Sequence, residues 1–415
     1  MNFIQTRAFK LYLLIVFIYL SWMLMQQEFT LNSIKVLYPL FFSFLILFFY
    51  NLYLEKFNKS FAYFLFFSIS LTSLFGATNV LDGSYAASSN PFLYGLAFYT
   101  AFFAFHIYKK TVSNDSIWIA ANPLILITGP IAYRFKYNNY KKIKSRLSYY
   151  LPFFVIGLVF FKIIATPLTY FLKMISMTNA VEVLIFGIIF ELFIYFNFCG
   201  LSLIIYSLFG IIGLKVPLNF KQPFSSRNII DYWKGWHLSL SKVLKTLFYN
   251  PIRKKYSLNS ALLAVYLSSA LWHGASANFL LWGFFHALCF MISVKFLKKD
   301  LKVLALFLMV PAIVIGRVIF ADTDFDRLIL KLSFSSNSPS ELILLLKGIP
   351  TISLISILFA SIWVSLEFLL QDARFFKERS YKFLRIPIIQ VFLMILFVLL
   401  AGSNTGVEYA VYSQR

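Results

Sequence analysis

Long apolar runs, separated by short polar segments, dominate the chain. Uncharged runs of about 16–25 residues are typical of helices that cross a bilayer. The pattern predicts an all-α polytopic membrane protein with about eleven transmembrane helices, and we expect residues 1–415 to form a single integral membrane domain. The predicted spans are 11–25, 36–54, 61–76, 91–108, 147–171, 181–213, 258–275, 278–294, 303–320, 349–370 and 386–401.

Two of the apolar runs do not fit a simple crossing. Residues 117–133 contain Asn122-Pro123 and Gly129-Pro130, which break helices. We therefore expect a re-entrant segment, and irregular backbone at membrane depth has to be covered by protein or line a wet cavity. The run 181–213 is too long for one straight crossing. We expect it to be tilted, or broken near Gly200 and Gly210.

Charge orients the predicted spans. The 38 basic residues outnumber 16 acidic ones, for a net charge of +22. The basic residues lie in short clusters between apolar runs, as the positive-inside rule requires, so nucleic-acid binding is not expected. Arg7 and Lys10 place the N-terminus on the cytoplasmic side, and the acidic stretch 322–341 falls outside. Segment 214–257 is basic but also rich in Trp, Phe, Leu and Ile, which predicts helices in or just under the cytoplasmic interface.

Composition narrows the class further. The chain is 60% hydrophobic and 13% charged, and a soluble domain has about a quarter of its residues charged. Cys199 and Cys289 lie far apart in apolar runs, which indicates neither a metal site nor a disulfide framework. No cleavable signal is evident before the first apolar run, which we interpret as a span.

Three of the four histidines fall in the stretch 233–286. His273 sits in an apolar run, about 20 Å along a helix that begins near residue 258. An imidazole that titrates near neutrality is costly at that depth unless it is used or satisfied. It could act as a general base. The structural alternative is a buried histidine bonded to a backbone carbonyl.

Several short motifs occur in a fixed order on this background. They are Gly129-Pro130-Ile131 with Arg134, Tyr195-Phe196-Asn197-Phe198-Cys199-Gly200, Pro217-Leu218-Asn219-Phe220 with Pro223-Phe224-Ser225-Ser226-Arg227, Tyr232-Trp233 through Trp236-His237-Leu238-Ser239-Leu240-Ser241, and Trp272-His273-Gly274 with Trp282-Gly283 and His286. Together they resemble the membrane-bound O-acyltransferase family, in its bacterial alginate O-acetyltransferase-like and D-alanyl transfer protein-like branch. The resemblance is clearest over 195–287. The departures are Asn197, where the family usually has an aspartate, Lys245-Thr246 and Ala287.

The resemblance implies a fold around a central tunnel and a set of site residues. His273 would be the catalytic base, and His237 the second catalytic residue, which positions the thioester or lines the entry of the donor. An interfacial Trp-His anchor is the alternative for His237. His286 would make a supporting hydrogen bond. The other residues expected to line the path of substrate or donor are Arg227, Trp233, Trp236, Ser239, Trp272, Asn278 and Trp282.

The activity implied is the transfer of a short acyl group, such as acetyl, from a cytoplasmic thioester to a hydroxyl. Acyl-CoA or an acyl carrier protein would donate it, with no permanent cofactor and no metal. The acceptor would be a cell-envelope or secreted polysaccharide, reached directly or through an extracytoplasmic SGNH-type transferase. The protein itself would lie in the bacterial cytoplasmic membrane. The alternatives are D-alanyl transfer to teichoic acid, a lipid-linked saccharide transporter, and a non-catalytic scaffold.

Overall fold

The computed structural model describes residues 10, 12–14, 16–17, 41, 43–48, 91–109, 111–112, 118, 121–131, 136–137, 142–177, 179–274, 276–322, 325–333, 339–370 and 386–401. The predicted span 61–76 lies outside these residues, and 11–25 and 36–54 lie largely outside them. The predicted number of eleven spans therefore stays a prediction. Within the described part, five helices are long and apolar enough to cross a membrane.

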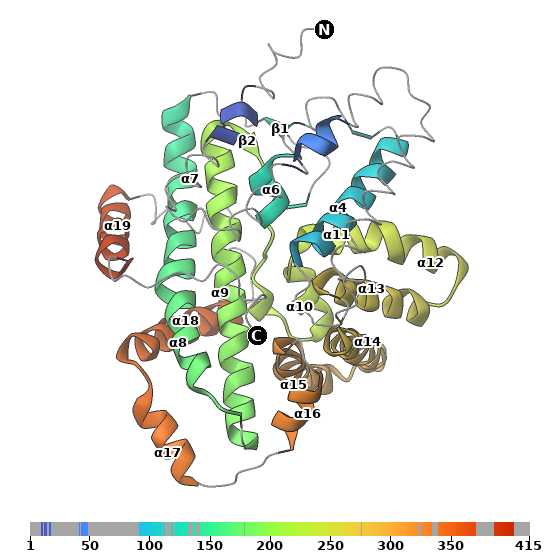
Figure 1. The fold of residues 1–415 in the computed structure, drawn as a ribbon, viewed down its shortest axis with the longest axis vertical. Coiled ribbons are helices and arrows are strands. Elements are labelled where there is room, and N and C mark those ends of the chain that lie inside the picture. The colour runs from blue at the N-terminus through green and yellow to red at the C-terminus, as the bar shows by residue number, and fades with distance from the viewer. Residues whose placement is uncertain are drawn as a thin grey trace.

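The two longest helices lie side by side (Figure 1). One runs without interruption through α7 (Ile143–Leu158), the π-helical stretch η4 (Val159–Ala165) and α8 (Thr166–Met174). The other, α9 (Ala180–Ile212), has 33 residues and is about 50 Å long. Of the two expected alternatives, a tilted helix or a break near Gly200 and Gly210, the break is wrong, because α9 is continuous there. These glycines instead allow close helix packing: a Cβ on Gly200 would lie 2.8 Å from the carbonyl oxygen of Gly157.

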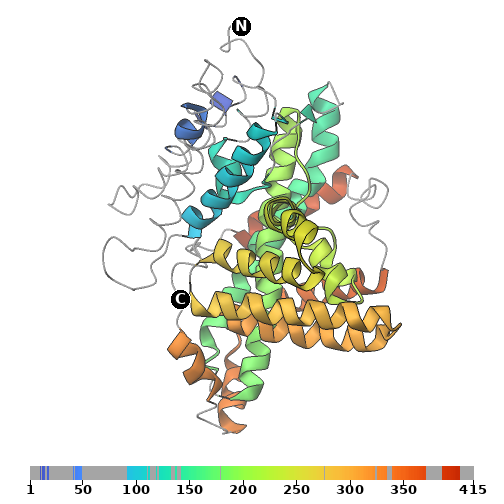
Figure 2. The same ribbon diagram turned by 90° about the vertical axis from the view of Figure 1, so that its right-hand side faces the viewer.

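A second group of helices contains α13 (Leu258–His273), α14 (Ala277–Lys298) and α15 (Lys302–Ala321). The helices α14 and α15 lie side by side and run across the direction of α9 (Figures 1 and 2). Chain neighbours in this group pack against each other, and α15 also packs against α9. These helices confirm the predicted elements at 258–275, 278–294 and 303–320 to within a few residues.

The chain between these groups forms short elements. Strands β1 (Lys136–Tyr137) and β2 (Leu214–Lys215) pair antiparallel, with Lys136 opposite Lys215. After them come the 3-10 turn η5 (Pro223–Ser225), α10 (Ile229–Gly235), α11 (Leu238–Leu244), the π-helical η6 (Lys245–Tyr249) and α12 (Asn250–Lys255).

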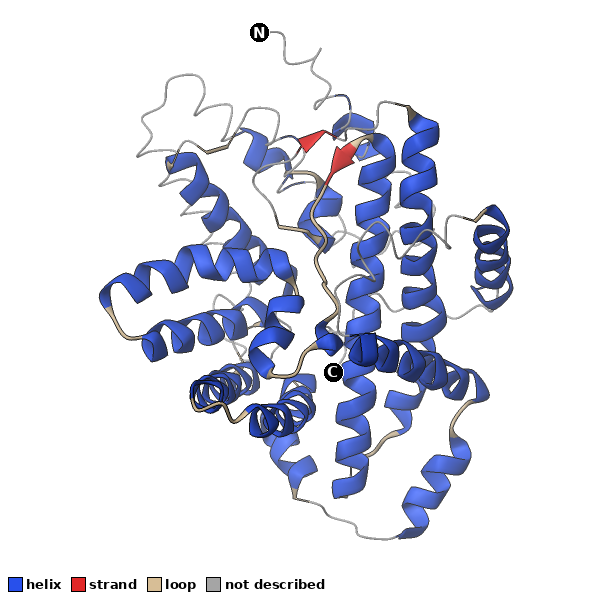
Figure 3. Cartoon of the chain, turned by 180° about the vertical axis from the view of Figure 1, so that it is seen from behind, coloured by secondary structure: helices blue, strands red, loops and turns tan. Residues whose placement is uncertain are grey.

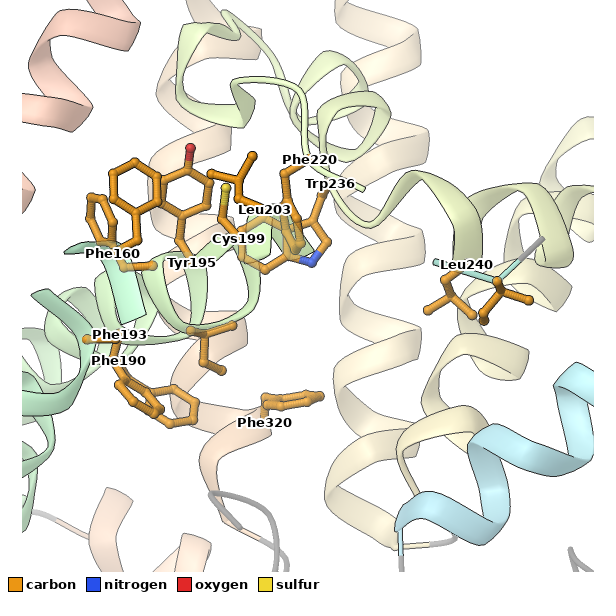
Figure 4. Close-up of a cluster of buried hydrophobic side chains, with 14 of the residues drawn as sticks. Phe160, Phe190, Phe193, Tyr195, Cys199, Leu203, Phe220, Trp236, Leu240 and Phe320 are labelled. Carbon is orange, nitrogen blue, oxygen red and sulfur yellow. The ribbon is translucent and has the colours of Figure 1, made fainter. Parts of the chain in front are cut away.

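Segment 214–257 forms short helices as predicted, and its place at the membrane interface stays a prediction. All lysines along it are exposed, among them Lys221, Lys234 and Lys242. Helices α10 and α11, however, belong to the protein core, since Tyr232 and Val243 have no exposed surface. Their apolar sides pack against other helices of the protein. Figure 4 shows part of this core, with Trp236 and Phe220 beside Tyr195 of α9.

The remaining helices surround this framework (Figure 3). Before α7 come α4 (Pro91–Tyr108) and the short α6 (Pro123–Thr128). After α15 come α16 (Phe325–Leu332), α17 (Pro339–Gly348), α18 (Thr351–Leu370) and α19 (Pro387–Ala401). The breaker residues around 123 and 129 leave only a six-residue helix in α6. The sequence did not predict α16 and α17, because the acidic stretch 322–341 was expected only to face outside between two spans.

Candidate active site

His273 is the last residue of α13, at a turn between two well-capped helices. The Ser257 and Ser276 side chains cap the N-termini of α13 and α14. Gly274 has a φ of 149°, a backbone conformation that L side chains rarely adopt. The His273 ring lies edge-on to Trp272 and Phe320, with both centroid distances 4.7 Å, and 5.6 Å from the Trp282 ring. An imidazole with a partly exposed face is therefore held in an aromatic setting.

His237 is the N-cap of α11. Its Nδ1 accepts a hydrogen bond from the Leu240 backbone N–H at 3.3 Å. An accepting Nδ1 leaves the proton of the neutral ring on Nε2. His237 lies outside the five candidate spans, and burial lowers the pKa of His237 to about 4. At neutral pH this ring is thus an uncharged Nε2–H donor.

Trp272 brings the two histidines together. Its ring lies 5.4 Å from that of His237 and 4.7 Å from that of His273, and it is nearly perpendicular to both. Helix α4 adjoins the outer edge of this indole, since a Cβ on Gly95 would lie 3.5 Å from Trp272 Nε1. The predicted catalytic pair, 36 positions apart in the sequence, thus shares one aromatic neighbour.

Ser239 and Asn219 fix the loop that precedes the site to α11. The Asn219 Oδ1 accepts from the Ser239 backbone N–H at 3.1 Å and from the Ser239 hydroxyl at 2.8 Å. The Leu238 N–H donates to the Asn219 carbonyl oxygen at 2.8 Å. The Ser239 hydroxyl, expected to line the donor path, thus bonds inside the protein. The sequence motif contained Asn219, but its role was not predicted.

Trp233, Trp282 and His286 form a second aromatic group next to the histidine pair. Their three pairwise centroid distances lie between 5.0 and 5.9 Å. Within the described residues, neither indole Nε1 nor His286 Nδ1 has a hydrogen-bond partner. His286 is held by close packing instead, for Gly316 of α15 leaves room for its ring. The expected supporting hydrogen bond is not formed by Nδ1 within this part of the chain.

Two other expected site residues, Asn278 and Arg227, bond to other segments of the chain. The Asn278 amide is buried and donates to the Asp322 carbonyl oxygen at 2.8 Å, which joins the start of α14 to the end of α15. Arg227 donates to the Phe368 carbonyl oxygen at 2.9 Å, and its guanidinium lies 3.5 Å from the centre of the Phe368 ring. Both residues hold the framework around the site.

The histidine pair and its aromatic surround thus lie within a helical protein that has several apolar helices long enough to cross a membrane. The profile of the membrane-bound O-acyltransferase family (MBOAT) matches residues 15–298, more than half of the chain. The chain belongs to this family. It is a multi-pass membrane protein, and the matched region contains His237, His273 and His286.

Individual MBOAT relatives match a shorter segment. The peptidoglycan O-acetyltransferase of Helicobacter pylori is 33% identical over 99 residues, 23% of this chain and 19% of the relative. A probable alginate O-acetylase of Pseudomonas putida is 34% identical over 99 residues, 23% of this chain and 20% of the relative. The teichoic acid D-alanyltransferase of Bacillus subtilis is 28% identical over 124 residues, 26% of this chain and 31% of the relative. Each match spans under a third of the relative's length.

This MBOAT chain also has buried charged residues next to the site, and these residues were not predicted from the sequence. Glu191 of α9 forms an ion pair with Arg317 of α15 and accepts a hydrogen bond from the Tyr232 hydroxyl. Glu367 of α18 accepts from the Tyr195 hydroxyl at 2.5 Å. The available signal was an ionisable residue inside a predicted span, which is rare and often functional.

Proposed function

We propose that this protein is an O-acyltransferase that takes a short acyl group from a cytoplasmic thioester and passes it to a hydroxyl beyond the membrane. The observation that supports this most is the pairing of His237 and His273 across Trp272. The two imidazoles differ in setting: His237 uses Nδ1 to cap a helix, whereas His273 ends a helix among aromatic rings. Two imidazoles in different settings suit two different tasks.

In the proposed reaction His273 is the general base. It takes the proton from the acceptor hydroxyl as that oxygen attacks the thioester carbonyl carbon. The Nε2–H of His237 donates to the oxyanion of the tetrahedral intermediate. The C–S bond then breaks, and the thiolate takes the proton from His273. The net change is one ester formed and one thiol released.

The finer assignments also belong to this proposal. We infer acetyl as the acyl group, because two of the three relatives described above are named for O-acetylation. The donor is acyl-CoA or an acyl carrier protein, bound transiently with no resident cofactor. The acceptor is a cell-envelope or secreted polysaccharide, reached directly or through an SGNH-type partner outside the membrane. The N-terminus lies in the cytoplasm of a bacterial cell.

The test replaces His273 in the host that encodes the protein. We expect His273→Ala and His273→Gln to abolish the base-labile acetate released from the isolated polysaccharide fraction, while the protein still accumulates in the membrane. Lys302→Gln, in an exposed ion pair with Asp300, is the matched control and retains full acetylation. Wild-type acetate release by both His273 variants would refute the proposed function.

D-alanyl transfer is the second candidate, supported by the similarity to a teichoic acid D-alanyltransferase. The chemistry at His273 is the same, but the acyl group has a charged amine. Identification of the base-released product separates the two candidates. Acetate supports the first candidate, and D-alanine that depends on His273 replaces it with the second.

A further inference from the structure

A buried ion pair lies behind the two histidines. Glu191 and Arg317 are only 4% and 5% exposed. They join α9 to α15 across 126 positions of sequence. Burying two charges costs several kcal/mol per ion, and such pairs are often no more stabilising than apolar residues of the same size. This ion pair therefore calls for an explanation other than stability.

Arg317 also contacts two aromatic rings that lead to the histidines. Its guanidinium carbon lies 4.7 Å from the centre of the Trp236 ring and 5.9 Å from that of Phe320. Trp236 immediately precedes His237 in the chain. Phe320, one turn after Arg317 on α15, lies edge-on to His273 at 4.7 Å. One guanidinium thus contacts a neighbour of each imidazole.

Glu191 bonds to both Arg317 and Tyr232. One carboxylate oxygen accepts from Arg317 Nε, and the other accepts from the Tyr232 hydroxyl. Tyr232 in turn stacks on Trp236, with centroids 5.6 Å apart and an angle of 22° between the planes. Helix α10, which contains Tyr232 and Trp233, is therefore attached to α9 and α15 directly beside the site.

We propose that Arg317, oriented by Glu191, is a positioning residue that sets His237 relative to His273 through Trp236 and Phe320. This inference rests on the proposed acyl transfer at these histidines. A planar guanidinium can stack on an indole while it donates to a carboxylate, whereas the lysine ammonium is a compact point charge. The role therefore requires arginine, not only a positive charge.

Helices α9 and α15 also make a close contact that does not involve the ion pair. A Cβ on Gly187 of α9 would lie 2.8 Å from the Val314 carbonyl oxygen of α15, so the two backbones approach closely near the pair. Apolar residues in place of all three polar groups would leave no buried charge unpaired. Such a variant separates a structural role from a positioning role.

The first variant is the triple substitution Glu191→Leu/Arg317→Met/Tyr232→Phe. Its kcat and KM are measured with [14C]acetyl-CoA in inside-out membrane vesicles, together with its melting temperature in detergent. We expect a melting temperature close to that of the wild type, a KM for acetyl-CoA within about threefold, and a kcat roughly 10- to 100-fold lower because the reacting groups are misplaced. A wild-type kcat in this folded variant would overturn the proposal.

The second variant, Arg317→Lys, decides the question if the triple variant does not fold. It keeps a cation opposite Glu191 but loses the planar stack on Trp236. We expect it to fold and to show the same selective loss of kcat, whereas wild-type kcat would overturn the proposal. Lys302→Gln, at the other end of α15, is the control and leaves kcat unchanged. Failure of the underlying acyl transfer is distinct, because wild type and His273→Ala would then transfer label equally.

Discussion

At the scale of single residues, His237 combines a strained backbone with a capping side chain. Its φ of 42° places a non-glycine residue in the left-handed region, which costs on the order of 1–3 kcal/mol and is common at active sites. The hydrogen bond from Leu240 N–H stabilises this conformation and fixes the tautomer of the ring. The local fold therefore determines that Nε2 is the nitrogen of the neutral His237 ring that carries the proton.

The depressed pKa of His237 predicts a stability change with pH. Its folded pKa of about 4 lies below the ordinary value of 6.5, so protonation favours unfolding, and stability falls as the pH drops from 6.5 toward 4. Asparagine can also cap a helix and adopt positive φ. Between pH 7 and pH 5, we expect the free energy of unfolding to fall by about 1–2 kcal/mol less in His237→Asn than in the wild type. Thermal unfolding in detergent at both pH values checks this, and identical pH dependence of the two proteins would contradict it.

At the scale of elements, the apolar runs in the sequence predict where helices lie, but they do not predict which helices pack against each other. The expected helices 91–108 and 349–370 match α4 and α18 closely. In lipid, a long apolar run forms a helix because the helix satisfies all of its backbone hydrogen bonds internally. The predicted break in α9 was wrong, because a glycine that breaks a helix and one that admits a neighbour look alike in sequence.

The role of Gly200 as a packing contact predicts the effect of a methyl group there. The Cβ of Gly200→Ala would lie 2.8 Å from Gly157 O and from Phe161 N, which are backbone atoms that cannot move aside cheaply. Overpacking costs about 1–3 kcal/mol, and the better helix propensity of alanine returns about 1 kcal/mol. We expect a lower melting temperature. The control Gly348→Ala meets only the flexible Met174 Cε and should show no loss; an equal effect of both changes would contradict this account.

The N-cap of α10 supports the aromatic residues of the site. Asn228 Oδ1 accepts from Asp231 N–H at 2.9 Å, and Asn228 Nδ2 donates to the Asp231 carboxylate at 2.8 Å. We expect Asn228→Ala to destabilise the protein by about 1 kcal/mol and to lower acyl transfer, because α10 contains Trp233. Asn228→Ser, which retains a capping oxygen, should restore most of both. Unfolding and label transfer are measured side by side, and full activity in Asn228→Ala would show that the cap does not support the site.

At the scale of the whole molecule, the hydrophobic pattern predicted the class of the protein but not how the site is assembled. The motifs predicted both histidines, yet their shared contact with Trp272 and the Glu191–Arg317 pair arise from tertiary packing. Sequence periodicity does not contain such long-range pairings. The outer surface of α14 follows the pattern directly, with the exposed apolar residues Leu280, Leu281, Phe284, Leu288 and Ile292.

The orientation in the membrane can be measured with cysteine reporters. The exposed Lys299 lies just after α14, and the exposed Asp326 lies in α16. The positive-inside rule predicts that a cysteine at 299 reacts with a membrane-impermeant maleimide only from the cytoplasm, and one at 326 only from outside. Cys199 and Cys289 are buried and should give little background. Labelling of both positions from the same side would contradict the topology.

Transfer across a sealed bilayer tests the central claim most directly. Purified protein is reconstituted in vesicles with [14C]acetyl-CoA outside and acetyl-free polysaccharide, together with any partner transferase, inside. The account predicts base-labile label on the enclosed polysaccharide with wild type and none with His273→Gln. Equal label on the polysaccharide with His273→Gln, or none with wild type, would contradict it.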